Sequence, residues 1–282
     1  MASRRSTASR ASAAGFERLR GDWLDGLGSA NTRDAYERDL EGFRVWCTEE
    51  GHAPLHATTG HVESYRDACN DRGAGRATIS RRLSALSSFY DHAVEAEAVA
   101  DNPVRAAARP TPSRSPRPAS LTDSESTALY DAALELGPRE AALVGLLLWD
   151  GLKLGEALAL DLDEIDVRGS TLWISVRRRG RTDNLRLDPR SARAIRRYVA
   201  GRNRGPLFVG QSPTRAADLR LTRFGGDYLV KQAARDAGLE GRVSANTLRR
   251  SYMAAAHRRG STTERIRAQV GHRSERDTRR FL

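Results

Sequence analysis

The residues of this chain that could do chemistry gather near its end, in residues 243–282. Ten arginines stand there against three acids. Asn246 and Arg249 lie three residues apart in a segment with helical apolar spacing, His272 follows a glycine, and Phe281 comes nine residues after that histidine. A guanidinium fork can bind a phosphate group with two parallel hydrogen bonds, and a histidine can titrate near neutral pH. Side chains of these types can therefore contact phosphate groups.

This spacing resembles the C-terminal half of the tyrosine recombinase (phage integrase) family. That family carries a His-x-x-Arg box on one helix, then a Gly-His pair, then a nucleophilic tyrosine nine residues after the second histidine. Here Asn246 and Arg249 hold the two ends of the box, His272 completes the pair, and Phe281 holds the tyrosine position. The resemblance extends over nearly the whole chain from residue 16 onward.

Two segments upstream extend the resemblance. The family has a Gly-Leu-Arg-x-x-Glu-Leu turn and helix, in which the arginine clamps the scissile phosphate and the glutamate braces the fold. This chain keeps Glu156 but has Lys153 in place of the arginine. The family also has a Gly-Lys-Gly hairpin, whose lysine donates a proton to the leaving 5′ oxygen. The aligned residue here is Arg179.

The resemblance implies a phosphoryl transfer without metal or cofactor, in which a tyrosine oxygen attacks phosphorus and leaves a 3′-phosphotyrosine. Its six reactive positions are held here by Lys153, Arg179, Asn246, Arg249, His272 and Phe281. All of them except Arg249 and His272 differ from the family. Phe281 has no hydroxyl and cannot be a nucleophile, and Arg179 is a poor general acid because the pKa of arginine exceeds about 12. We therefore expect a DNA-binding protein that does not cleave strands by itself.

Alternatives remain open from the sequence. The chain could be an active recombinase that uses a nucleophile from another subunit or a nearby hydroxyl, such as that of Ser274 or Thr278. It could also be a truncated remnant, because family members usually extend past the tyrosine position. Arg249 could serve a salt bridge with Glu156 instead of a phosphate, and His272 could cap a helix.

The elements that must position these residues begin with a helical domain over residues 16–103. Apolar residues at steps of three and four predict four helices, which resemble the family's core-binding domain, the part that clamps one side of a duplex. Arg76, Arg81 and Arg82 are expected on or beside the polar face of the fourth helix, where they would meet phosphates. The alternative is a solvated helix face.

Two segments outside the domains have distinct compositions. Residues 1–15 are rich in Ser, Arg and Ala and contain no acid, which predicts a disordered basic arm. Residues 104–119 hold four prolines, four arginines and no acid, which predicts an extended linker able to follow a DNA backbone.

The second domain is expected over residues 120–282. Residues 122–125 form a capping box, and short alternating segments at 165–167, 172–176 and 185–187 predict three strands. Residues 177–181 would form the tip that joins the second and third strands. The fold class expected is mainly α with a small antiparallel β-sheet, in which a helical SAM-like domain precedes an α+β catalytic-type domain. The DNA contacts expected in this domain are Arg177, Arg178, Arg181 and Arg250.

Composition agrees with these expectations. The 282 residues carry a net charge of +11, which favours a polyanion as partner. Only two cysteines are present, without a C-x-x-C pairing, which predicts a reduced cytoplasmic protein with no metal site. No apolar run reaches the roughly 20 residues of a membrane span. We expect double-stranded DNA as partner, a nucleoid-associated location, and a homo-oligomer or a mixed tetramer with an active recombinase.

Overall fold

The computed structural model describes residues 2–28, 30–108, 120–210 and 219–282, with side chains described from residue 14 onward except at 30 and 31. The chain divides into two compact units, Met1–Arg114 and Ser115–Leu282, which we call the helical unit and the α+β unit. The expected fold class is confirmed, because helices dominate and three strands form one antiparallel sheet.

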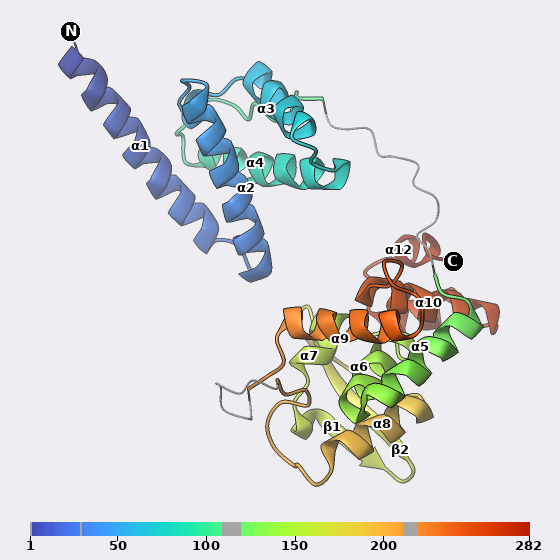
Figure 1. Ribbon diagram of the computed structural model, residues 1–282. Coiled ribbons are helices and arrows are strands. Elements are labelled where there is room, and N and C mark those ends of the chain that lie inside the picture. The colour runs from blue at the N-terminus through green and yellow to red at the C-terminus, as the bar shows by residue number, and fades with distance from the viewer. Residues whose placement is uncertain (1, 29, 109–119, 211–218) are drawn as a thin grey trace. The chain divides into compact units, whose positions relative to one another are not determined.

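The helical unit is built around one central helix. Its elements are α1 (Ala2–Asp25), α2 (Ala30–Glu49), the 3-10 turn η1 (Pro54–His56), α3 (Thr59–Asp71) and α4 (Arg76–Glu95). Helix α4 contacts α1, α2 and α3 (Figure 1). Aromatic rings fill the space between these helices, with Phe43 edge-on to Tyr65 at 5.1 Å and to Tyr90 at 6.4 Å between centroids. Such pairs add to the stabilisation from buried area.

The segments predicted as arm and linker differ in part from their expected state. Helix α1 begins at Ala2 and so covers most of residues 1–15, which agrees with the high helix propensity of Ala and Arg. Of the predicted linker, residues 109–119 lie outside the described residues. Val104 and Ala107 are buried in the core of the helical unit, so the first part of the predicted linker belongs to that unit.

The α+β unit also surrounds one buried helix. Helix α6 (Pro138–Leu148) is buried from Glu140 to its end and contacts α5 (Asp123–Leu136), α7 (Leu154–Ala159) and three later helices, which are α8 (Pro189–Val199), α9 (Arg223–Asp236) and α10 (Ala245–Arg258). Two short helices, α11 (Thr263–Val270) and α12 (Glu275–Arg279), complete the unit. The predicted capping box is present, with Thr122 and Glu125 bonded reciprocally at the start of α5.

The sheet lies in the order β1-β2-β3, with antiparallel pairing throughout. Its strands are β1 (Ile165–Arg168), which follows the 3-10 turn η2 (Leu162–Glu164), β2 (Thr171–Arg178) and β3 (Arg181–Arg186). Along β2, side chains alternate between the buried and the open face, as a pleated strand requires. This alternation puts Leu172, Ile174, Val176 and Arg178 on the buried face.

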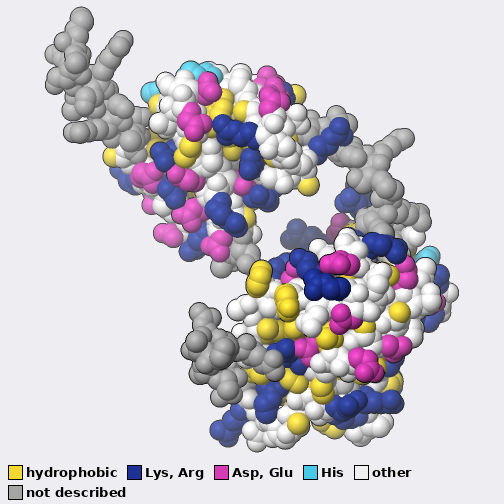
Figure 2. Space-filling model, viewed as in Figure 1, with side chains coloured by type: hydrophobic (Ala, Val, Ile, Leu, Met, Phe, Trp, Pro, Cys, Tyr) yellow, Lys and Arg dark blue, Asp and Glu magenta, His cyan; other side chains and the backbone are white. Residues whose placement is uncertain are grey.

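No helix in the described ranges is long and apolar enough to cross a bilayer. The same residues contain no group of His, Cys, Asp and Glu side chains able to hold a metal ion. On the face of the helical unit seen in Figure 2, basic and acidic side chains are interspersed.

Candidate nucleic-acid interface

The tip of the β2–β3 hairpin consists of two residues, Arg179 and Gly180. Arg178 pairs with Arg181 across the turn, and both tip residues have positive φ, +51° at Arg179 and +77° at Gly180. Such a pair of conformations matches the twist of a tight hairpin, although it costs energy at a residue with a side chain. The tip is shorter than the predicted 177–181, and it leaves the Arg179 side chain exposed to solvent.

Arg178 was predicted to contact DNA, but its side chain is buried in the α+β unit. Its Nε and Nη2 donate to the two carboxylate oxygens of Glu156 at 3.1 and 2.9 Å, and its Nη1 donates to the backbone oxygen of Gln269 at 2.9 Å. Gly271 lies directly against this side chain, where a Cβ would collide with the guanidinium. The strand parity of β2 explains the difference, because residue 178 shares the buried face with Val176.

Arg249 is the second buried guanidinium of this region, with 5% of the residue exposed. Its Nη1 donates to the backbone oxygen of Gly151 at 2.6 Å, and its Nη2 donates to that of Val270. Burial lowers its pKa to about 10, against the opposing charge of Glu156, so the group stays protonated at neutral pH. Two of its five donors are thus taken by carbonyls of the fold.

Arg178 and Arg249 together cap the end of α11. The carbonyls of Gln269 and Val270 belong to the last turn of that helix, which has no intrahelical donors for them. Positive charge at a helix C-terminus is favourable. The two arginines therefore fix the position of the residues that follow, including His272.

Glu156 joins the cationic side chains into one network. Besides both contacts to Arg178, its carboxylate lies 3.1 Å from Nζ of Lys153 and 3.7 Å from Nη1 of Arg249, and it accepts the backbone N–H of Lys153 at 3.0 Å. Burial alone would raise its pKa, but the bonds from Arg178 and the Lys153 backbone, with the charges of both residues, hold the pKa below its usual value. The contact between Glu156 and Arg249 is the one that the sequence left open as the alternative to a phosphate contact of Arg249. The contacts of Glu156 agree with the bracing role that the resemblance implies for it.

Two predicted reactive residues point into solvent. The Lys153 side chain is 49% exposed and precedes α7. Asn246 is exposed in the first turn of α10 and makes no side-chain hydrogen bond within the described residues. Both keep free donors for an external ligand.

His272 lies among these cationic groups. Its pKa is lowered to about 4, first by burial and then by the charges of Arg249, Lys153 and Arg179, with Asp277 opposing them. The imidazole is therefore neutral at pH 7 and acts through hydrogen bonding. Lys153, Arg179 and Arg249 around His272 form what we call the cationic cluster.

Two contacts join the imidazole to α12 and to the residues that follow it. Its Nδ1 lies 3.0 Å from Oγ1 of Thr278, and its ring centroid lies 5.9 Å from that of Phe281. Thr278 is fully buried. Phe281 packs against a small core that includes Met253 and Ile266. The residue expected at the family's nucleophile position thus lies beside His272, and its side chain is an apolar ring.

The other predicted DNA contacts of the α+β unit differ in exposure. Arg177 and Arg181 are well exposed and form ion pairs with Glu164 at 2.6 Å and Asp183 at 3.1 Å. Arg250 is half-buried, and its Nε has no partner in the part of the chain that the structure describes.

In the helical unit, Arg76 is exposed and pairs with no described residue. Arg81 forms an ion pair with the buried Asp39, and Arg82 lies 4.0 Å from the same carboxylate. Arg81 and Arg82 therefore also brace α4 against α2.

Two residues that position the cluster, Asp150 and Gly151, were not singled out from the sequence. Asp150 is buried, accepts the backbone N–H of Asp188 at 2.7 Å, and its own carbonyl accepts Nε2 of Gln269 at 3.0 Å. Burial raises its pKa to about 8. Gly151, with φ of +68°, lies against the ring of Tyr252, which leaves no room for a Cβ. The Asp-Gly pair before Lys153 was the available signal for a tight turn, and the packing role expected for Tyr252 is confirmed.

Two family models match this chain, one in each unit, and both describe phage integrases. A family model described as "Phage integrase, N-terminal SAM-like domain" matches residues 23–97, and one described as "Phage integrase family" matches residues 119–282. Tyrosine recombinase XerD of Caulobacter vibrioides is 30% identical over 256 residues, which cover 86% of this chain and 82% of that protein. XerD of Corynebacterium glutamicum is 30% identical over 269 residues, covering 87% and 85%.

Solved structures share the fold at lower identity. XerH recombinase bound to a palindromic difH substrate, in a post-cleavage complex, matches with a TM-score of 0.73 and 14% identity, covering 88% of this chain and 75% of that one. A lambda integrase dimer bound to a COC′ core site matches with a TM-score of 0.70 and 17% identity, covering 93% and 76%.

Proposed function

This chain belongs to the phage integrase family, and from that premise we propose that it binds duplex DNA at the cationic cluster without cleaving a strand by itself. One observation carries the proposal. Lys153 and Arg249 share the carboxylate of Glu156, and Arg249 also donates to the backbone oxygen of Val270, two residues before His272. The ring of Phe281, the residue expected at the family's tyrosine position, lies 5.9 Å from the imidazole of His272.

The cluster is suited to hold a backbone phosphate in two layers. Lys153 and Arg179 form the outer layer, because their side chains reach solvent and retain donors. Arg249 forms the inner layer. Hydrogen bonds to two backbone carbonyls fix its guanidinium, which adds positive charge on the protein side of the phosphate. Fixed cations of this kind stabilise phosphate without rearranging.

The same groups lack what strand cleavage requires. Phe281 offers no oxygen to attack phosphorus. Arg179 cannot release a proton to a leaving oxygen near neutral pH. His272, neutral at pH 7, can accept or donate one hydrogen bond, and the aromatic ring 5.9 Å from it is that of Phe281, which has no hydroxyl.

The relatives support duplex DNA as the ligand. The matched relatives are named tyrosine recombinases, and the two solved structures above are bound to a difH substrate and to a COC′ core site. A further solved structure with the same fold is lambda integrase bound to DNA. For this chain we propose site occupancy on DNA during recombination, as a homo-oligomer or together with an active recombinase that supplies the missing hydroxyl.

A second candidate function is strand cleavage through another hydroxyl, and one contact favours it. Thr278 Oγ1 lies 3.0 Å from Nδ1 of His272, which is the geometry of a hydroxyl beside a base. The full burial of Thr278 argues against it, because a duplex phosphate cannot reach that oxygen while α12 is in place.

The two candidates separate in a trapping experiment with nicked duplexes, which retain any covalent protein–DNA intermediate. We expect no adduct with the wild-type chain on denaturing gels. An adduct that disappears in Thr278→Val, an isosteric change, would establish the second candidate.

Binding itself is tested by fluorescence anisotropy of a labelled duplex over a range of salt concentrations. A steep negative log–log slope is expected, since each neutralised phosphate contributes about −0.9. A slope near zero would remove the proposed function.

A further inference from the structure

Asp150 is a buried acid of the α+β unit whose charge the fold does not balance. The residue follows the C-cap of α6 and is 2% exposed. Its Oδ1 accepts the backbone N–H of Asp188 at 2.7 Å, whereas its Oδ2 has no hydrogen-bond partner within the described residues. Among the same residues, no guanidinium or ammonium group forms an ion pair with this carboxyl.

The surrounding helices supply no free positive charge to this carboxyl. The titratable groups within its electrostatic reach are Asp188 and Arg190 at the start of α8, Tyr130 of α5 and Tyr252 of α10. Arg190 is the cation of this set, and it forms an ion pair with Asp188 at 2.9 Å. From α11 the uncharged amide of Gln269 approaches, and it donates to the backbone oxygen of Asp150 at 3.0 Å.

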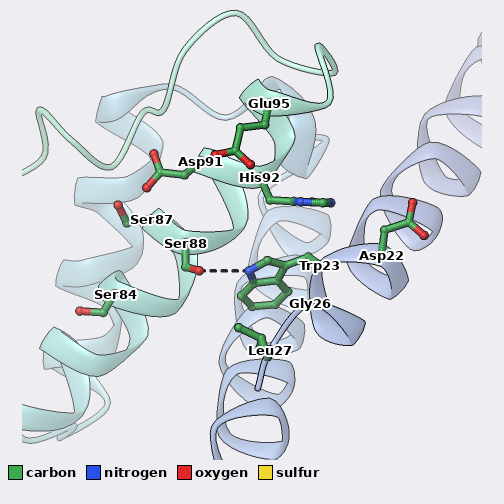
Figure 3. A pocket seen from close by; sticks show the side chains of 10 residues that line it. All are labelled: Asp22, Trp23, Gly26, Leu27, Ser84, Ser87, Ser88, Asp91, His92 and Glu95. Atoms are coloured by element: carbon green, nitrogen blue, oxygen red, sulfur yellow. Dashed lines mark hydrogen bonds between the residues drawn. The ribbon is translucent and has the colours of Figure 1, made fainter. Parts of the chain in front are cut away.

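Acids in a hydrated setting show the contrast. Asp22, Asp91 and Glu95 line an open cavity of about 520 Å³ between α1 and α4, where water can solvate their charges (Figure 3). Asp91 also forms an ion pair with Arg105 at 2.8 Å. Water and cations stabilise the charge of such carboxylates. Asp150 has neither, and an ionised carboxylate in that setting carries a large energetic cost.

A proton on Asp150 removes this cost. Burial raises the pKa of Asp150 to about 8, so the group is mostly neutral at pH 7. The hydroxyl of Ser191 faces this carboxyl, and its Oγ likewise has no partner in the part of the chain that the structure describes. A proton on Oδ2 would donate to this Oγ, which satisfies two buried oxygens at once.

The loop that begins at Asp150 carries contacts of the cationic cluster. The next residue, Gly151, accepts Nη1 of Arg249 with its backbone oxygen at 2.6 Å, and Lys153 follows two positions later. Through its carboxyl and its own backbone oxygen, Asp150 also joins this loop to the start of α8 and to α11. Its protonation state therefore bears on the loop that holds two members of the cluster.

We propose that Asp150 is a positioning residue of the cationic cluster and works in its neutral, protonated form. Loss of the proton leaves an unpaired charge beneath the Gly151 loop, which loosens the hold on Arg249 and Lys153 and weakens duplex binding at alkaline pH. The effect on binding rests on the proposed function, whereas the proton is a property of the folded chain alone.

One substitution gives a matched test in the full chain. Asp150→Asn keeps the shape of the side chain and cannot ionise. Its amide oxygen still accepts the N–H of Asp188, and its amide N–H groups can donate to Ser191. The control is Asp22→Asn, which removes the charge of an exposed acid in the helical unit.

Urea denaturation between pH 5 and pH 9 measures the proton. The unfolded chain releases it near pH 4 and the folded chain near pH 8, so the wild type loses stability relative to Asp150→Asn as the pH rises between these values. The ratio of their folding constants should change about tenfold per pH unit from pH 5 to 7 and level off above pH 8. Asp22→Asn should run parallel to the wild type. Parallel curves for Asp150→Asn and the wild type would overturn the proposal.

A second measurement needs no variant. In the wild type, the carbon NMR signal of one aspartate carboxyl should titrate near pH 8. Titration of every aspartate signal below pH 6 would likewise overturn the proposal, even if Asp150→Asn failed to fold.

Fluorescence anisotropy with a labelled duplex at pH 7 and pH 9 tests the link to the cluster. From pH 7 to 9 the wild type should lose about tenfold more affinity than Asp150→Asn, because one proton is lost with a midpoint near pH 8. Equal losses would overturn the positioning role and leave the proposed function standing. A wild type that binds no duplex at pH 7 would remove the proposed function together with the effect on binding, and the urea curves would still decide the proton.

Discussion

Two arginines in the α+β unit and two in the helical unit have opposite surroundings. In the α+β unit, Arg178 and Arg249 are buried, and their donors go to Glu156 and to backbone carbonyls. In the helical unit, Arg38 and Arg72 line an open cavity with few acceptors around them. An arginine-rich stretch therefore does not by itself mark a binding surface. The protein acceptors around each guanidinium decide whether it supports the fold or remains free for phosphate.

The sharpest way to break this comparison is to remove one guanidinium from each region. Arg178→Met should lower the free energy of unfolding by about 3–5 kcal/mol, because it leaves Glu156 buried without its bidentate partner. Arg38→Met should change it by less than about 0.5 kcal/mol. Urea denaturation of the full chain measures the free energy of unfolding of both variants. Equal losses in the two variants would contradict the difference between the buried and the exposed arginine.

A pair of glycines tests whether the cluster is more tightly built than an ordinary helix end. Gly151 and Gly51 both have positive φ, but only a Cβ at Gly151 collides with a neighbour, the ring of Tyr252. Gly51→Ala should cost about 1–2 kcal/mol from backbone strain alone. Gly151→Ala should cost a further 1–3 kcal/mol, roughly, from overpacking. Equal urea denaturation midpoints for the two variants would show that the loop before Lys153 can shift to make room for the added Cβ. That result would contradict the tight packing against Tyr252.

Arg249→Lys separates charge from geometry in the inner layer of the cluster. Lysine keeps the positive charge, but its ammonium cannot bridge the carbonyls of Gly151 and Val270 as a planar fork does. We expect a loss of about 1–3 kcal/mol in unfolding free energy. A variant as stable as the wild type would mean that charge alone holds α11 in place.

The next prediction concerns the pH dependence of stability. The folded pKa of His272 is lowered to about 4 from an ordinary value of 6.5, so the unfolded chain binds more protons between these values. The contribution of this group to stability is thus complete above pH 6.5 and falls as the pH drops toward 4. His272→Gln should flatten the curve in this window, and His56→Gln, at an exposed histidine of the helical unit, should not. Parallel curves for the two variants would contradict the buried setting of His272.

Much of the fold follows from local patterns in the sequence. Helical spacing and the Thr122–Glu125 box predicted the helices, and alternation predicted the three strands. The gathering of Lys153, Arg179 and Arg249 around His272 was expected from the family's spacing alone.

The internal use of Arg178 could have been found from strand parity, since it continues the buried row of Ile174 and Val176. The two backbone carbonyls to which Arg249 donates could not have been found from the sequence. Which helix end lies beside α10 depends on tertiary packing between segments far apart in sequence. The burial of Asp150 depends on the same kind of packing, since α11 and the start of α8 lie against it.

The most direct test of the central claim is the salt dependence of duplex binding by Lys153→Gln/Arg179→Gln, which removes the outer layer of the cluster. The control is Arg168→Gln/Arg235→Gln, which removes two other exposed cations of the same unit, paired with Asp166 and Glu240. The account predicts that the log–log slope falls in magnitude by about 2 in the first variant and stays near the wild-type value in the control. An unchanged slope in the first variant would contradict the claim that this cluster holds DNA phosphate.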